Sequence, residues 1–147
     1  MASALTLAGE HALVTGGGTG IGAAIALALA ERGAAVTICG RRLPELQTSA
    51  ARHKNIHLQI ADVTDADSLG WLYRDAQVAR GSFGIVIANA GAADSAPAEK
   101  VSRALWDHAI AVNLTGAFLS VQPALAAMRE RKWGRIVFIA STAGLRG

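Results

Sequence analysis

Several residue types are scarce in this sequence, and each scarcity excludes a class of protein. The single cysteine among 147 residues, Cys39, excludes a disulfide-stabilised scaffold and a zinc site built on cysteines. Charged residues make up only 17% of the chain, and the formal charge of +3 is too small to predict a nucleic-acid partner. The four histidines show no metal-ligand spacing with carboxylates, so we expect no metal site.

Segments that would direct the chain to a membrane are also missing. Residues 1–10 carry no basic stretch of the kind that opens a secretory signal, and the apolar run 23–30 is far too short to span a bilayer. The basic residues within 129–135 end a predicted helix, where cations complement the helix dipole, and Glu130 interrupts them. We therefore expect a cytoplasmic protein with no membrane and no nucleic-acid partner.

Apolar residues, in contrast, are plentiful. They form 52% of the chain and raise the mean hydropathy to +0.33, which excludes disorder and supplies a sizeable core for one domain, residues 1–147. Five short runs rich in β-branched residues are bounded by Gly or Asp, and apart from residues 56–60 they do not alternate with polar residues. This pattern is typical of strands buried on both faces. The runs are residues 12–15, 35–39, 56–60, 84–88 and 135–140.

Four helices are predicted between these strands. Apolar residues recur at helical spacing from Ile21 to Leu29, and the longest helix runs from about Ser102 towards Arg131 with a kink at Pro123. Capping signals mark the others: Gly33 after the first helix, Pro44 at the first position of the second, and Thr64 with Asp67 opening residues 65–78. Strands and helices in alternation predict an α/β fold with a doubly wound parallel sheet.

A glycine-rich loop joins the first strand to the first helix. Glycines there allow backbone amides to approach an anion closely, and the helix N-terminus adds free N–H groups and the positive end of its dipole. The usual G-x-G-x-x-G/A spacing fits only Gly18, Gly20 and Ala23, which lie too far from the strand. The spacing that begins at the strand end is Gly16-x-x-x-Gly20-x-Gly22, within Thr15-Gly16-Gly17-Gly18-Thr19-Gly20-Ile21-Gly22.

This spacing resembles the first motif of the short-chain dehydrogenase/reductase family, T-G-x-x-x-G-x-G. Four further stretches are similar to motifs of that family, in the same order, so the resemblance covers nearly the whole chain. They are Asp62-Val63, Ala88-Asn89-Ala90-Gly91 (with Ala88 in place of a first Asn), Asn113 in the long helix, and Ser141 in Ser141-Thr142-Ala143-Gly144. The resemblance implies a Rossmann fold and the N-terminal part of a longer reductase, ending after the fifth strand.

The resemblance also implies roles for these residues. Asp62 and Val63 would contact the adenine ring, Ser141 would bond the substrate oxygen, and Asn113 would hold a water in a proton relay. The alternative for Asn89 and Asn113 is that they only tie strand and helix together. The cofactor-binding residues that we expect are Thr15, Gly16, Gly18, Thr19, Gly20, Ile21, Gly22, Arg41, Arg42, Asp62, Val63, Asn89, Ala90 and Gly91.

The end of the second strand indicates which dinucleotide is bound. An acidic residue there would bond the ribose 2′-hydroxyl of NAD, whereas an arginine accommodates the 2′-phosphate of NADP. This chain has Gly40 at the expected acidic position, followed by Arg41 and Arg42. We predict NADP as the cofactor, with Arg41 as the main contact and Arg42 as a secondary one. The alternative is a solvated arginine pair at the start of a helix.

One part of the family's chemistry is missing from these residues. The family uses a Tyr-x-x-x-Lys pair after the serine, and the only tyrosine here, Tyr73, precedes it and has no lysine four residues later. The resemblance implies ketone and secondary-alcohol interconversion, with an acyl thioester such as a 3-oxoacyl group as the leading substrate, in a homodimer or homotetramer. Two alternatives remain: a non-catalytic dinucleotide-binding module or inactive fragment, and an interaction protein that uses the apolar long helix.

Overall fold

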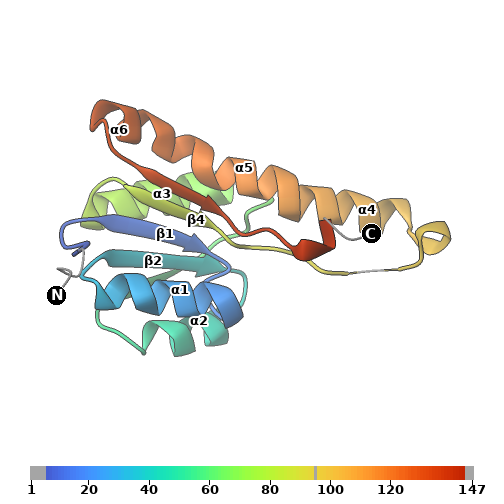
Figure 1. The fold of residues 1–147 in the computed structure, drawn as a ribbon, viewed down its shortest axis with the longest axis horizontal. Helices are drawn as coiled ribbons and strands as arrows, with labels where there is room; N and C mark the ends of the chain where they lie inside the picture. Colours follow the sequence, from blue (N-terminus) through green and yellow to red (C-terminus); the bar gives the residue numbers. More distant parts are fainter. Residues whose placement is uncertain (1–5, 95, 145–147) are drawn as a thin grey trace.

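Five parallel strands form a single sheet in the computed structural model, which describes residues 6–94 and 96–144 (Figure 1). The order across the sheet is β3-β2-β1-β4-β5, so the chain winds outwards from β1 first in one direction and then in the other. This confirms the predicted doubly wound fold, and the strand ends differ from the predicted ones by at most two residues. The strands are β1 His11–Thr15, β2 Ala35–Gly40, β3 Ile56–Ile60, β4 Ile85–Ala88 and β5 Arg135–Phe138.

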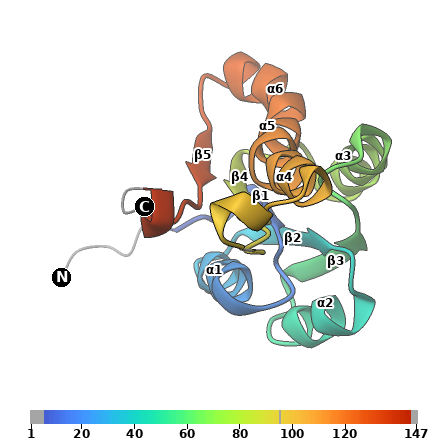
Figure 2. The same ribbon diagram turned by 90° about the vertical axis from the view of Figure 1, so that its right-hand side faces the viewer.

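Helices cover both faces of the sheet (Figure 2). The helices α1 (Gly20–Glu31) and α2 (Leu43–Ala50) lie on one face, and α3 (Ala66–Arg80) lies on the other beside the long helix. Side chains of β1 alternate between the two layers: Val14 packs in the cluster under α1, and Leu13 packs in the cluster under α3 and the long helix. The sheet is therefore the middle layer of a three-layer structure.

The long helix is not uniform. Its segments are α4 Arg103–Ile110, the π-helical η2 Ala111–Thr115, α5 Gly116–Val121, the 3₁₀ turn η3 Gln122–Ala124 and α6 Leu125–Glu130. The predicted start is confirmed, because Ser102 caps the helix by accepting a hydrogen bond from the Leu105 amide at 3.1 Å. Pro123 lies in the 3₁₀ turn, where an irregularity was predicted. The π-helical turn upstream was not predicted. Two further 3₁₀ turns are η1 Ala98–Lys100 and η4 Thr142–Gly144.

Two predicted helix starts are corrected by one residue. The N-cap of α3 is Asp65, whose carboxylate accepts hydrogen bonds from the amides of Asp67 and Ser68; the predicted cap, Thr64, instead donates its hydroxyl to Asp62 at 2.8 Å. A carboxylate is the stronger acceptor at a helix N-terminus, which explains the choice. In α2 the first helical residue is Leu43, so Pro44 is second.

The two outer strands are less buried than the sequence pattern predicted. In β3 only Ile56 is buried, and β5 is more exposed still. All four of its residues are exposed, and Phe138 keeps 56% of its surface accessible. Among residues 6–94 and 96–144 it pairs only with β4. Cys39 in β2, in contrast, is fully buried, and this burial raises the pKa of its thiol to about 12, so the thiol is unreactive at neutral pH.

A buried histidine lies at the amino end of the sheet. His11 is the first residue of β1, and only 2% of its surface is exposed. Its Nδ1 lies 2.8 Å from the Gly81 carbonyl and its Nε2 lies 2.8 Å from the Thr37 hydroxyl, while its ring lies 4.1 Å from that of Phe83. Burial lowers the pKa of His11 to about 4, so the ring is neutral at pH 7.

Residues 103–130 have the length and composition of a membrane-crossing helix, with a mean hydropathy of 1.4 in the most apolar window. The inner face of this helix, however, packs against the sheet through buried residues such as Val121 and Met128. Core helices of globular domains pass the same test, so these two properties alone assign no membrane segment. The outer face carries a stripe of exposed apolar residues: Trp106, Ile110, Leu114, Phe118 and Leu125.

Candidate dinucleotide site

The glycine loop lies at the carboxyl edge of the sheet, between β1 and α1. Gly16 and Gly20 have φ values of +64° and +52°, a left-handed conformation that residues with a side chain rarely adopt. The Gly17 amide donates to the Cys39 carbonyl at 3.2 Å, which fastens the loop to the end of β2. The N-cap residue Thr19 makes no side-chain cap hydrogen bond, and the first turn of α1 holds no acidic residue. The positive end of α1 is thus left available for an anion.

Hydrogen bonds to the residues that follow the neighbouring strand β4 hold this loop in place. The Asn89 side-chain amide donates to the carbonyls of Thr15 and Gly16 at 2.9 and 3.2 Å. In return, the Thr15 hydroxyl accepts from the amides of Asn89 and Ala90, both at 3.0 Å. A Cβ on Gly22 would lie 2.5 Å from the Asn89 amide nitrogen, so only glycine fits there. The loop conformation therefore depends on β4 as well as on its own glycines.

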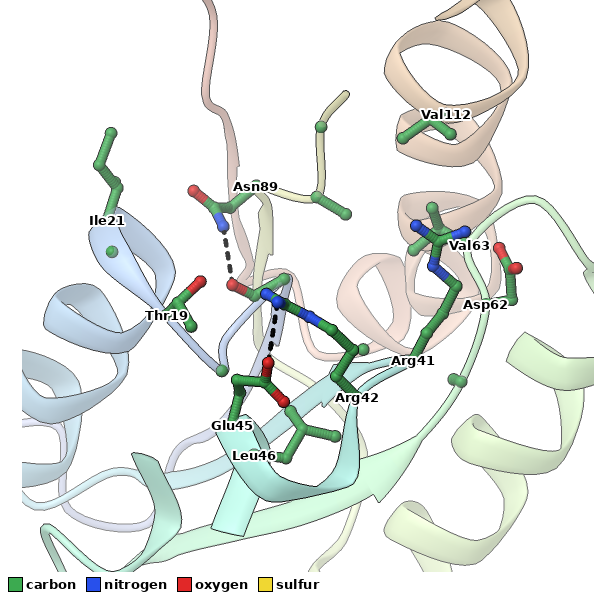
Figure 3. A pocket seen from close by; sticks show the side chains of 17 residues that line it. Thr19, Ile21, Arg41, Arg42, Glu45, Leu46, Asp62, Val63, Asn89 and Val112 are labelled. Atoms are coloured by element: carbon green, nitrogen blue, oxygen red, sulfur yellow. Dashed lines mark hydrogen bonds and ion pairs between the residues drawn. The ribbon is translucent and has the colours of Figure 1, made fainter. Parts of the chain in front are cut away.

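A cavity of about 380 Å³ opens above this loop (Figure 3). It extends from the glycine loop across the ends of β2 and β3 to the long helix, as expected for a ligand site at the point where the winding direction reverses. All the predicted cofactor-binding residues line it except Thr15 and Gly22, which lie beneath the loop and support it. The lining residues are Gly16, Gly18, Thr19, Gly20, Ile21, Gly40, Arg41, Arg42, Glu45, Leu46, Ala61, Asp62, Val63, Asn89, Ala90, Gly91 and Val112.

Four charged side chains line this cavity, two arginines and two carboxylates, so their charges cancel. Figure 3 shows Arg41 directed towards Asp62 and Val63, whereas Arg42 turns towards Glu45. The Arg42 guanidinium lies 2.8 Å from the Glu45 carboxylate. The Thr64 amide, which donates to the Asp62 carboxylate at 2.9 Å, holds the pKa of that carboxyl below its usual value, and the Thr64 hydroxyl and Arg41 act in the same direction.

Glu45 is the functional candidate that the sequence reading missed. It is the third residue of α2, and the predicted helix start at Pro44 could have placed it on the turn that faces the glycine loop. In the structure, a Cβ on Gly18 would lie 3.2 Å from that of Glu45, so α2 packs closely over the loop. Leu46, Ala61 and Val112 were missed because they contribute only apolar surface to the cavity.

The two predicted catalytic residues do not line the cavity. The Asn113 side chain is bound at both ends to Ala92: its oxygen accepts from the Ala92 amide at 2.8 Å, and its nitrogen donates to the Ala92 carbonyl at 2.9 Å. Ser141 follows β5 at the same carboxyl edge, and its exposed hydroxyl accepts from the Ala143 amide at 3.1 Å. Asn113 therefore ties the π-helical turn to the segment after β4, a contact that is compatible with either of its two expected roles.

In residues 6–94 and 96–144, no three His, Cys, Asp or Glu side chains gather in a way that could hold a metal ion.

The profile of the short chain dehydrogenase family matches residues 10–147. This chain belongs to that family. The short-chain dehydrogenase resemblance read from the motifs is thereby confirmed across the whole sheet.

Curated relatives of this short-chain dehydrogenase chain carry enzyme names. It is 36% identical over 143 residues to the D-beta-hydroxybutyrate dehydrogenase of Cupriavidus necator, covering 95% of this chain and 55% of the relative. It is 38% identical over 148 residues to 2-(S)-hydroxypropyl-CoM dehydrogenase 3 of Xanthobacter autotrophicus, covering 96% and 57%. The chain thus spans a little over half the length of these relatives.

A solved structure shares the fold of this short-chain dehydrogenase chain. The crystal structure of a Burkholderia xenovorans protein, described as a short-chain dehydrogenase/reductase, superposes with a TM-score of 0.90 at 34% sequence identity. The match covers 96% of this chain and 60% of that one. The parallel sheet and its flanking helices are therefore those of the family.

Proposed function

We propose that this chain forms the dinucleotide-binding part of an NADP(H)-dependent oxidoreductase that interconverts a ketone and a secondary alcohol. The proposal rests on one observation: the same cavity is lined by the uncapped N-terminal end of α1 and by the arginine pair after β2. A dinucleotide needs both an anion site for its diphosphate and a separate site for its adenosine. Both sites lie along this wall.

The residues present fit such a cofactor. The first turn of α1 offers amides to the diphosphate, since neither a cap nor a carboxylate occupies them. Val63 and Asp62 lie beside Arg41 at the other end, where the adenine and its ribose would bind. Gly40 leaves the end of β2 without a carboxylate, and this favours NADP over NAD, with Arg41 as the main contact to the 2′-phosphate and Arg42 as the secondary one.

The chemistry that we assign to this chain uses Ser141 and Asn113. A bound nicotinamide would supply or accept the hydride. The Ser141 hydroxyl accepts one hydrogen bond from Ala143, and it donates to no residue in the ranges 6–94 and 96–144, so its hydrogen could be donated to a substrate oxygen. The side-chain oxygen of Asn113 keeps a second lone pair beside its bond to Ala92, and this lone pair is where a water of a proton relay would be held.

The relatives support the reaction class and leave the substrate open to proposal. Both dehydrogenases compared above are named after secondary alcohols, a hydroxybutyrate and a hydroxypropyl compound. From the motif resemblance we propose a 3-oxoacyl thioester as the leading substrate, a cytoplasmic location, and a homodimer or homotetramer. The exposed apolar stripe on the long helix, which includes Leu114 and Phe118, supports helix-to-helix assembly.

A second candidate is a dinucleotide-binding module without turnover. Tyr73 is the only tyrosine, and it is buried in α3 with its hydroxyl donating to the Ser120 carbonyl at 2.6 Å. Burial raises the pKa of this phenol above its usual value, and residue 77 is glutamine rather than lysine, so Tyr73 is unsuited to proton transfer at neutral pH. If the whole protein has no Tyr-x-x-x-Lys pair, this observation therefore favours a binding module without turnover.

Fluorescence titration with NADPH and NADH tests the cofactor assignment. We expect tighter binding of NADPH, and a loss of about tenfold in that preference in Arg41→Ala, because a charge-assisted hydrogen bond to the 2′-phosphate is removed. Arg52→Ala, an exposed arginine beyond α2, is the matched control. A preference that persists in Arg41→Ala would refute the assignment to Arg41, and failure of both nucleotides to bind would refute the function. Oxidation of NADPH on addition of a 3-oxoacyl thioester separates the enzyme from the module.

A further inference from the structure

The charge balance at the adenosine end of the cavity conflicts with a strong preference for NADP. A 2′-phosphate adds about −1.5 to −2 charges at pH 7, and a site that prefers it should offer surplus positive charge. Here the two arginines face two carboxylates, those of Glu45 and Asp62. The Asp62 carboxylate is already bound by the amide and the hydroxyl of Thr64, but Glu45 has Arg42 as its ion-pair partner.

The geometry points to Glu45 as a specificity-determining residue: we propose that Glu45 competes with the 2′-phosphate of NADP for Arg42, and thereby keeps the cofactor preference small. This inference rests on the proposed function, because it concerns the same cavity. Glu45 belongs to the first turn of α2 and is held over the glycine loop by the close packing of its backbone on Gly18. The backbone position of Glu45 is therefore set by the fold, and the Arg42 side chain folds over to form the ion pair with it.

The exposure of the two partners shows which of them can move. The Arg42 side chain is 68% exposed, while that of Glu45 is 30% exposed. Arg42 is the N-cap residue of α2 and makes no side-chain cap hydrogen bond, so the salt bridge is the contact that fixes its guanidinium. A phosphate that binds Arg42 must either displace the Glu45 carboxylate or lie close to that carboxylate and be repelled by it. Either event reduces the gain from binding the phosphate.

This competition explains why Arg42 would be the secondary contact. Arg41 points to the other side of the cavity, towards Asp62, and has no ion pair shorter than 4.0 Å in the part of the chain that the structure describes. Arg41 is thus ready to bind a phosphate, whereas Arg42 is already neutralised. An ordinary exposed ion pair between residues three apart would contribute little to stability and would leave the cofactor preference unchanged.

A double-mutant cycle on Glu45 and Arg42 tests the proposal, with the ratio of the Kd for NADH to the Kd for NADPH as the readout. We expect Glu45→Gln to raise this ratio about five- to tenfold, because Arg42 is released to bind the 2′-phosphate. Arg42→Ala should change the ratio less than about threefold in the wild-type chain, but about five- to tenfold in the Glu45→Gln background. The gain should shrink at about 1 M salt, where the Debye length falls to about 3 Å.

The control variant is Glu31→Gln, which removes the same charge from the exposed end of α1, at the opposite edge of the sheet. A variant that only destabilises the cavity would weaken the binding of both nucleotides and leave the ratio of their Kd values unchanged. A ratio in Glu45→Gln equal to that in Glu31→Gln overturns the proposal, and so does a gain that survives removal of Arg42. Absence of binding by either nucleotide to every variant overturns the proposed function and this inference together.

Discussion

His11 makes the stability of this chain depend on pH between 7 and 4. The ring is neutral when folded, with a pKa of about 4, against about 6.5 in the unfolded chain. As pH falls below 6.5 the unfolded chain takes up the proton first, so the contribution of His11 is complete above pH 6.5 and is lost as pH falls towards 4. Each unit of difference between the two pKa values corresponds to about 1.4 kcal/mol, giving about 3 kcal/mol in total.

The contacts of His11 explain why protonation is unfavourable. In the neutral ring, Nδ1–H donates to the Gly81 carbonyl, and Nε2 accepts from the Thr37 hydroxyl. A second ring proton would face that hydroxyl, which would have to turn its own hydrogen away inside the buried sheet. His57 and Arg80 add positive charge nearby and act in the same direction as burial.

Urea unfolding at pH 7 and pH 5 measures this effect. We expect the wild-type free energy of unfolding to fall by about 2 kcal/mol between these pH values, since about that share of the total lies in this window. His11→Gln should lose most of this difference, leaving the smaller contribution of His57, whose pKa is also lowered by burial. His53→Gln is the control and should behave like the wild type. A His11→Gln chain with the wild-type pH dependence would refute the reasoning.

Two further changes test the support beneath the glycine loop. Gly22→Ala should destabilise the fold by about 1–3 kcal/mol and weaken NADPH binding at least about tenfold, because its Cβ would displace the Asn89 amide; Gly70→Ala, in open space on α3, should instead stabilise by up to about 1 kcal/mol in urea unfolding. Thr15→Val should cost about 1–3 kcal/mol, since it leaves two half-buried amides without an acceptor, and Thr15→Ser should restore most of it; equal stabilities of the two variants would contradict the assigned hydrogen bonds.

The sheet and the loop were predictable because local signals specify them. Residues 12–15 and 35–39 are uncharged and mostly apolar, as is typical of a strand buried on both faces, and the spacing of Gly16, Gly20 and Gly22 follows from the sharp turn into α1. The positions of Asp62 and Asn89 at the same cavity then follow from topology, since the carboxyl ends of parallel strands share one edge.

Features that depend on contacts distant in sequence were not predictable. The π-helical turn at residues 111–115 is accompanied by the pairing of Asn113 with Ala92, 21 residues earlier, which no local pattern encodes. Glu45 entered the cavity because α2 packs on Gly18, a contact that only the folded chain makes.

The outer side of β5 lies apart from the ligand site. Within residues 6–94 and 96–144 its backbone amides and carbonyls pair only with β4, so the sheet can be extended at this edge by a further strand, from the same protein or from another molecule. The walls of the cavity come from the segments around β1 to β4 and from the long helix, and no residue of β5 lines it. Extension of the sheet at this edge would therefore leave the nucleotide pocket open.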